Sequence, residues 1–170
     1  HAGHSYQCRS KESIEAVHQE SKEPFLLLRD RYQKQYPELI LSYGDTPSCS
    51  VSEDFAGIDE IRPGNFVFYD ITQNIIGSNE LDEVAVAMAC PVVAIHPDRN
   101  EIVVYGGGVH LSKDRIEDPE VGIIFGRVVE QKGSGWGGCI PKMHLKSLSQ
   151  EHGIVSVPKE KMQDYAIGDL

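Results

Sequence analysis

The spacing of apolar residues changes near Tyr43, and this change restricts the possible folds more than any other feature of the chain. Before it, Ile14, Val17 and Phe25 follow steps of three or four residues, which is the period of an α-helix when Ser21 fills the gap. After it, short runs rich in Val, Ile and aromatic residues alternate with Gly, Pro, Asn and Asp. The sequence therefore predicts two structural regions, one α/β and one mainly β.

The first region is predicted to contain a long helix followed by a buried strand. Helical spacing covers residues 11–36, but Pro24 interrupts it, so we expect either a kinked helix or two helices with Ser21 capping the second. Residues 39–43 form a short apolar run that ends in Gly, Asp, Thr and Pro at 44–47, as a strand does where it enters a loop. A helix followed by a buried strand is the unit of a parallel α/β layer.

The second region is predicted to consist of strands without a helix. The β-type runs are residues 66–69, 84–95, 101–105, 121–129, 144–148 and 153–157. Residues 96–100 join two of these runs closely, which indicates an antiparallel hairpin. Residues 131–138 are rich in glycine and are expected to form a hairpin tip or flap.

Charge and cysteine usage narrow the possible partners and compartments. With 16 Lys and Arg against 26 Asp and Glu, the net charge is −10, so a phosphate backbone would be repelled and we expect no nucleic acid partner. No apolar run reaches the roughly 18 residues of a membrane span. The four cysteines are widely spaced, which favours free thiols and the cytoplasm. The chain begins without Met or a signal peptide, so we expect a fragment.

Residues 42–48 form the first candidate site. A strand end followed by Gly44, Asp45 and Thr46 can direct backbone N–H groups and hydroxyls at a phosphate, and such loops lie at the carboxyl ends of barrel strands. The alternative is a turn in which Asp45 and Thr46 bond to their own backbone. The spacing alone favours the turn.

His1, His4 and Tyr6 form the second candidate site, because they precede a helix that would follow a barrel strand. Histidine transfers protons near neutral pH or binds a metal, and a tyrosine hydroxyl can bond a ring nitrogen. The alternative is that side chains at a chain terminus are solvated and have no role.

Two further segments belong to the β region. Gly106–Gly108, followed by His110, lacks the spacing of a phosphate-binding P-loop and is expected to form a β-bulge or a tight crossing at a domain or subunit contact. Residues 149–153, which include His152, are expected to form a solvated turn. The zinc patterns HExxH and HxH do not occur.

Four segments in series resemble one enzyme family, the D-threonine aldolase and D-serine dehydratase group of fold-type III pyridoxal 5′-phosphate (PLP) enzymes, which is related to alanine racemase. The segments are residues 1–6, 44–49, 60–70 and 148–153. The resemblance implies the C-terminal β/α units of a PLP-binding TIM-type barrel over residues 1–70. A mainly antiparallel β domain, incomplete at its C-terminus, would follow over residues 71–170.

The resemblance also implies roles for individual residues. His4 would lie in the catalytic pocket, with Tyr6 near the pyridine nitrogen. The implied cofactor-binding residues are Tyr6, Ser42, Gly44, Asp45, Thr46, Arg62, Gly64 and Tyr69. The Schiff-base lysine of the family would precede His1 and is absent from this chain. The metal-binding pair, His-x-Asp or His-x-Cys, would follow Leu170, so we expect no metal ligand here.

These features lead to several hypotheses for function. The resemblance implies part of a homodimeric lyase that uses PLP and Mn or Zn to act on β-hydroxy D-amino acids, with the fragment itself inactive. A racemase of the same fold is an alternative, and a non-catalytic binding or dimerisation module is another. A hydrolase that uses only a metal bound by histidines is the last; its candidate ligands are His1, His4, His110 and His152.

Overall fold

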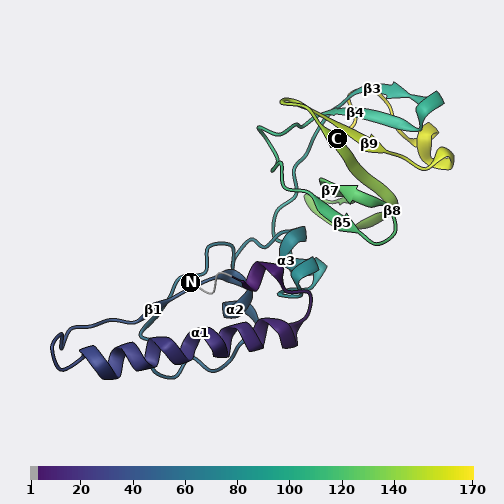
Figure 1. Cartoon of the computed structure of the whole chain (residues 1–170). Coiled ribbons are helices and arrows are strands. Elements are labelled where there is room, and N and C mark those ends of the chain that lie inside the picture. Colours follow the sequence, from purple (N-terminus) through teal and green to yellow (C-terminus); the bar gives the residue numbers. More distant parts are fainter. Residues whose placement is uncertain (1–3) are drawn as a thin grey trace. The chain divides into compact units, whose positions relative to one another are not determined.

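The computed structural model describes residues 4–170 and divides into two compact units, one ending at Val86 and the other spanning Ala87–Leu170 (Figure 1). The division lies later than the boundary at residue 70 that the sequence predicted. The reason is the packing of Ile76, which is buried against Cys8 and Ile14 near the start of the first unit. The segment after residue 70 therefore completes the core of the first unit.

Helix α1 spans Lys11–Tyr32 and dominates the first unit. It begins with a reciprocal capping box between Ser10 and Ser13, which satisfies free N–H groups of the first turn. The helix continues through Pro24 as one element, so the expectation of two helices with a cap at Ser21 was wrong. Proline removes one hydrogen bond, but the buried face of α1 is packed on both sides of it.

Two very short strands form the only sheet in the described part of the first unit. Strand β1 (Ser42–Tyr43) pairs in parallel with β2 (Glu60–Ile61). The predicted strand over residues 39–43 is thus reduced to its last two residues. Leu41 precedes the ladder, and its N–H bonds to the Asp59 carboxylate instead of to a neighbouring strand.

Two short helices correct the expectation that no helix follows Tyr43. They are α2 (Thr46–Val51) and α3 (Ile71–Ile76), each capped by an aspartate side chain. Six residues are too few to show helical periodicity, so only the capping residues could have signalled them. The predicted strand at residues 66–69 is also absent, because that segment turns and ends at Tyr69 with φ 50°.

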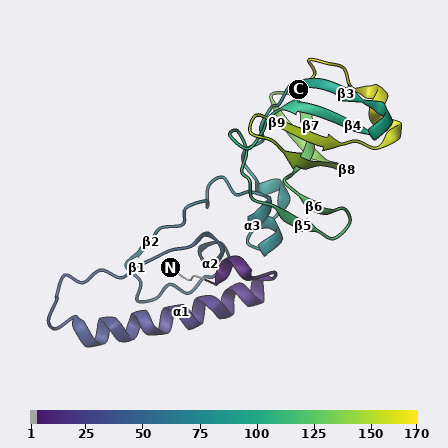
Figure 2. The same cartoon turned by 45° about the horizontal axis from the view of Figure 1, so that its top comes forward.

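The second unit contains a five-stranded antiparallel sheet with the order β3-β4-β9-β8-β7 (Figure 2). Its strands are β3 (Val92–His96), β4 (Glu101–Tyr105), β9 (His152–Ser156), β8 (Gly135–Leu148) and β7 (Gly126–Lys132). A separate antiparallel pair joins β5 (Ile116–Asp118) to β6 (Gly122–Ile124). Together these strands confirm the antiparallel character predicted for this region.

Hairpins were predicted more accurately than the limits of the long runs. The β3–β4 hairpin turns at residues 97–100, where Asn100 adopts φ 53°, and the β7–β8 hairpin turns at Gly133 and Ser134. The run over residues 84–95 becomes a strand only at Val92. The run over residues 121–129 is split at Phe125, between β6 and β7.

The core of the second unit is apolar and is formed mainly by side chains from the strands of the large sheet. Its buried members are Val92, Ile102, Val104, Met143, Leu145, Val155 and Val157. Four short 3-10 segments complete the described chain: η1 (Ser5–Gln7), η2 (Leu81–Glu83), η3 (Pro97–Arg99) and η4 (Lys159–Asp164). Within residues 4–170, none of the helices combines the length and apolar character needed to cross a membrane.

Candidate functional site

The bend after β1 is shaped by Asp45 and Gly44. The Asp45 carboxylate accepts the Ser48 N–H at 2.8 Å through Oδ1 and so caps α2, whose first turn contains Pro47. Gly44 needs to be glycine, because a Cβ there would lie 2.6 Å from the Arg62 carbonyl oxygen. Asp45 thus has the local turn role that was the alternative to phosphate binding.

The segment after β2 closes against this bend. The Arg62 N–H donates to the Tyr43 carbonyl at 2.8 Å, and the Asn65 N–H donates to the Thr46 hydroxyl oxygen at 2.9 Å. Between these two contacts, Gly64 faces open space, since a Cβ on it would meet no atom within 4 Å. The structure therefore brings two of the segments implied by the resemblance together around Gly44, Thr46 and Gly64.

Ser42 and Arg62 make a separate polar group on the surface. Arg62 Nε donates to the Ser42 hydroxyl at 2.6 Å and lies 2.8 Å from the Glu60 carboxylate. The Arg62 side chain is 69% exposed, so this group is held by surface contacts that are individually weak. In this arrangement, Arg62 neutralises Glu60.

Tyr69 is tied to the back of the bend through α2. Its hydroxyl donates to the Ser50 hydroxyl at 3.1 Å, and Ser50 donates in turn to the Thr46 carbonyl at 2.7 Å. The left-handed backbone at Tyr69 is uncommon for a residue other than glycine and turns its ring toward α2.

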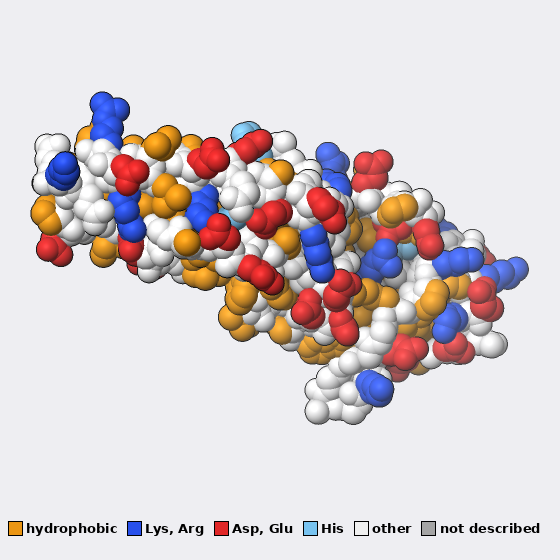
Figure 3. All heavy atoms as spheres, turned by 90° about the horizontal axis from the view of Figure 1, so that it is seen from below, with side chains coloured by type: hydrophobic (Ala, Val, Ile, Leu, Met, Phe, Trp, Pro, Cys, Tyr) orange, Lys and Arg blue, Asp and Glu red, His pale blue; other side chains and the backbone are white. Residues whose placement is uncertain are grey.

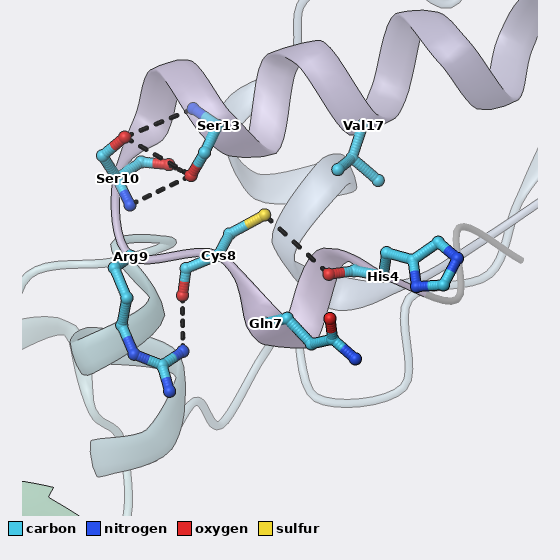
Figure 4. Close-up of a pocket in the computed structure, with 7 residues that line it drawn as sticks. All are labelled: His4, Gln7, Cys8, Arg9, Ser10, Ser13 and Val17. Carbon is cyan, nitrogen blue, oxygen red and sulfur yellow. Dashed lines mark hydrogen bonds between the residues drawn. The ribbon is translucent and has the colours of Figure 1, made fainter.

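The N-terminal candidates lie next to α2 as well. Segment η1, which carries Tyr6, packs against α2, and the Tyr6 side chain remains 44% exposed. His4 lines an open hollow of about 500 Å³, with His4 and Gln7 at one end and Ser10 and Ser13 at the other (Figure 4). His1 lies outside the described residues.

Two buried residues of the first unit were missed by the sequence analysis. His18 is fully buried, and Lys22, one turn later on α1, is 5% exposed; both contact Asp54. The Lys22 ammonium group lowers the pKa of the Asp54 carboxyl. The available signal was their spacing of four residues from the buried Ile14, which places all three on one face of the helix.

The candidates in the second unit are held together by a close backbone approach. A Cβ on Gly107 would lie 2.4 to 2.5 Å from backbone atoms of the turn before β9, and the Gly108 N–H donates to Ser149 there. The predicted tight crossing is confirmed, but it lies inside one unit. It sets the rings of His110 and His152 edge-on to Tyr105, at centroid distances of 4.9 and 5.6 Å.

Metal ligands are not clustered in the described part of the chain. Among residues 4–170, no three His, Cys, Asp or Glu side chains are arranged to hold a metal ion. Its four cysteines are free thiols, and burial raises the pKa of Cys49, Cys90 and Cys139. Neither finding supports the hydrolase hypothesis.

Sequence comparison identifies the second unit. The model of the family described as "Putative serine dehydratase domain" matches residues 85–170, half of the chain. The chain belongs to this family. The matched residues cover the second unit, which contains the antiparallel sheet described above.

Individual relatives of this serine dehydratase family member match both units. D-serine dehydratase of Dictyostelium discoideum is 34% identical over 125 residues, which make up 67% of this chain and 30% of that protein. D-threo-3-hydroxyaspartate dehydratase of Delftia sp. (strain HT23) is 26% identical over 160 residues, which make up 92% of this chain and 40% of that protein. The chain thus spans less than half the length of the curated relatives it matches.

Solved structures show the fold of this family member. An alanine racemase-like protein from Idiomarina loihiensis matches with a TM-score of 0.85 and 24% identity, over 99% of this chain and 45% of that one. A metal-free variant of D-threo-3-hydroxyaspartate dehydratase matches with a TM-score of 0.86 and 23% identity over the same shares. The combination of helices and antiparallel sheet is therefore that of alanine racemase-like proteins.

Proposed function

We propose that this chain is the C-terminal portion of a PLP- and metal-dependent lyase that acts on β-hydroxy D-amino acids, as D-serine dehydratases do. One observation supports this most directly: the bend at Gly44–Thr46 meets the segment around Gly64 beside η1, so three segments of the family motif converge. The dehydratase relatives support the reaction class, and the metal-free form of one of them supports a metal. The first unit would then be the end of the barrel.

The converging residues fit the phosphate of the cofactor in part. Gly44 and Gly64 offer backbone without side chains. The Thr46 oxygen already accepts the Asn65 N–H, so its hydroxyl hydrogen is the group that would donate to a phosphate oxygen, but the side chain is 1% exposed and the bend must open to admit the anion. Asp45 is different, because its Oδ2 is buried without a hydrogen-bond partner among the described residues. An anion beside that carboxylate would be repelled, so we place the phosphate on Gly44, Thr46 and Gly64.

The remaining residues would act on the ring and on the substrate. PLP, when bound, supplies an electron sink for the amino acid. The Tyr6 hydroxyl would bond the pyridine nitrogen, and the His4 imidazole would hold or move a proton in the same pocket. Tyr69 would support the bend from behind through Ser50, and Ser42 would hold the Arg62 guanidinium near the same edge.

The proposal can be tested by titrating the chain with PLP while its amide NMR signals are recorded. We expect the signals of Gly44, Thr46 and Gly64 to move, and we expect no pyruvate from D-serine, because the family resemblance implies that none of the lysines of this chain forms the Schiff base. If PLP leaves these three signals unchanged and shifts others, the phosphate assignment is wrong. Turnover by the chain alone would also contradict the proposal.

A pair of matched variants sharpens this test. Thr46→Leu fills the bend and should abolish the PLP-induced shifts, whereas Thr72→Leu, at a half-buried position in α3, should leave them intact. Equal PLP binding by both variants would exclude Thr46 from the site. The proposed homodimer can be checked separately by sedimentation of the same protein.

A further inference from the structure

Tyr43, the residue directly before the bend, is closely packed. Tyr43 ends β1 directly before Gly44, and its side chain is fully buried. Its ring makes edge contacts with His18, Phe25 and Phe55, at centroid distances of 5.2, 6.2 and 6.0 Å. Such contacts fix the end of a strand more firmly than its two ladder residues could.

The hydrogen bonds of His18 establish which atoms donate. Its Nε2 lies 2.8 Å from the Asp54 carbonyl oxygen, which can only accept, so Nε2 carries the proton. In the neutral imidazole, whose second ring nitrogen carries no proton, Nδ1 then accepts from the Tyr43 hydroxyl at 3.1 Å. Burial raises the pKa of Tyr43 to about 12, so the hydroxyl keeps the proton that this bond requires.

These two bonds reach both ends of the same segment. Tyr43 lies just before the bend and α2, and Asp54 lies just after them. One imidazole on α1 therefore joins the entry and the exit of the segment that carries Gly44 and Thr46. Lys22 reinforces the exit, because its Nζ lies 2.6 Å from the Asp54 carboxylate and 3.2 Å from the Asp54 carbonyl.

The helix that provides this imidazole is itself well anchored. Its Glu15 carboxylate accepts the Ser52 hydroxyl at 2.5 Å, at the C-terminal end of α2. The bend can thus move relative to α1 only if one buried and several partly buried bonds break together. Buried networks of this kind fix one arrangement when every bond is made.

We propose that His18 is a positioning residue for the anion-binding bend, joining Tyr43 to Asp54 and thereby holding Gly44 and Thr46 in place. The identity of the anion, the PLP phosphate, rests on the function proposed above, but the positioning role does not. His18 is fully buried and acts through these two partners.

Two substitutions separate the two hydrogen bonds that the His18 imidazole makes. In His18→Asn, the side-chain oxygen can take the place of Nδ1 and accept from Tyr43, but the contact with Asp54 is lost. In His18→Gln, the amide nitrogen can take the place of Nε2 and donate to Asp54, but the contact with Tyr43 is lost. Tyr43→Phe removes the same bond from the other side, so it should resemble His18→Gln.

Amide hydrogen exchange measures positioning without any ligand. We expect the N–H groups of Ser48, Arg62 and Asn65 to exchange about tenfold faster in His18→Gln and Tyr43→Phe, while α1 and the second unit keep their rates. His152→Gln and Tyr36→Phe change exposed residues and should leave all rates unchanged. Unchanged rates at the bend, or equal acceleration throughout the first unit, would overturn the positioning role.

A comparison of PLP with pyridoxal, which lacks the phosphate, tests the ligand. The unsubstituted chain should bind PLP more tightly than pyridoxal, and His18→Gln should reduce this preference about tenfold. If the unsubstituted chain binds both equally, the phosphate assignment fails, while the exchange rates still decide the role of His18. If the preference survives in a variant whose bend exchanges faster, His18 does not position the anion site.

Discussion

The two units bury different kinds of side chain. The second unit has an apolar core, and Asp118 is the one buried charged or polar side chain found in its described residues. The first unit buries polar groups instead; they are Ser5, His18, Lys22, Asp45, Thr46, Ser48, Ser52, Gln73, Ser78 and Asn79. The free energy gained by burying apolar surface does not depend on the direction of the contact, whereas the strength of a hydrogen bond depends on the distance and angle between its two groups.

Both units expose large apolar side chains. In the first unit, several of them lie on or near the short strands; they are Ile40, Ile61, Phe66, Val67 and Phe68. On the face seen in Figure 3, acidic and basic side chains are interleaved with apolar ones. Because its buried side chains are apolar, the second unit should be stable through its core alone, whereas the polar groups buried in the first unit make its shape depend on individual hydrogen bonds.

The largest expected effect comes from the apolar core. Leu145→Ala removes a buried side chain of β8 and should lower the free energy of unfolding of the second unit by about 2–5 kcal/mol. Urea unfolding followed by the fluorescence of Trp136, the single tryptophan, reports on this unit. Amide exchange in α1 should not change. Equal loss in both units would show that they do not unfold independently.

The buried tyrosine should give the first unit an alkaline limit. Because folding raises the pKa of Tyr43 from 10.0 to about 12, the folded state holds this proton more tightly than the unfolded state. The resulting stabilisation is complete below about pH 10 and is lost as the pH rises through 12, by up to about 2–3 kcal/mol.

Circular dichroism of the helical signal in urea would measure this loss. Tyr43→Phe should remove the part of the alkaline loss that Tyr43 causes, while Tyr36→Phe, at an exposed position, should retain it. Identical alkaline curves for the two variants would show that Tyr43 does not set the limit.

The close backbone approach at Gly107 in the second unit should give a loss of stability of intermediate size. Gly107→Ala places a methyl group against the backbone of the turn before β9, so it should destabilise the unit by about 1–3 kcal/mol. Gly138→Ala, where the space around the Cβ is open, is the control. Thermal unfolding followed at Trp136 would compare them, and equal melting temperatures would mean that the turn yields easily.

The smallest effect concerns an ion pair on the sheet. Hydrogen bonds from Lys146 and Arg99 lower the pKa of Glu101, so the stabilisation they give is present above the ordinary carboxyl range and is lost as the pH falls through the lowered value. Glu101→Gln should therefore cost about 0.2–1 kcal/mol at neutral pH and nothing in strong acid. A constant cost at all pH values would contradict the ion pair.

Local signals in the sequence predicted more than long-range ones. The turn at residues 97–100 and the glycine-rich hairpin tip follow from neighbouring residues, and both were predicted. The bend at Gly44 was likewise found from its turn residues, although its capping by Asp45 was only the alternative. Helices α2 and α3 were missed because a single turn and a half shows no period.

The contacts that shape the candidate site could not be predicted in the same way. His18 and Tyr43 are separated by 25 residues, and Thr46 meets Asn65 across 19. Which residues meet across such distances depends on how the helices and strands pack, and no local pattern records it. A histidine in an apolar helix face is compatible with many partners.

Strand β8 divides at Lys142, whose backbone has φ 62° in the middle of the strand. From His144 onward, β8 pairs with both β7 and β9, whereas the part of β8 before Lys142 pairs with β7 alone. The tip at Gly133 therefore ends a two-stranded ribbon formed by β7 and the first part of β8. Evolution can lengthen or shorten this ribbon in steps of two residues, one from each strand, while every alternating side chain in the rest of the sheet keeps its face.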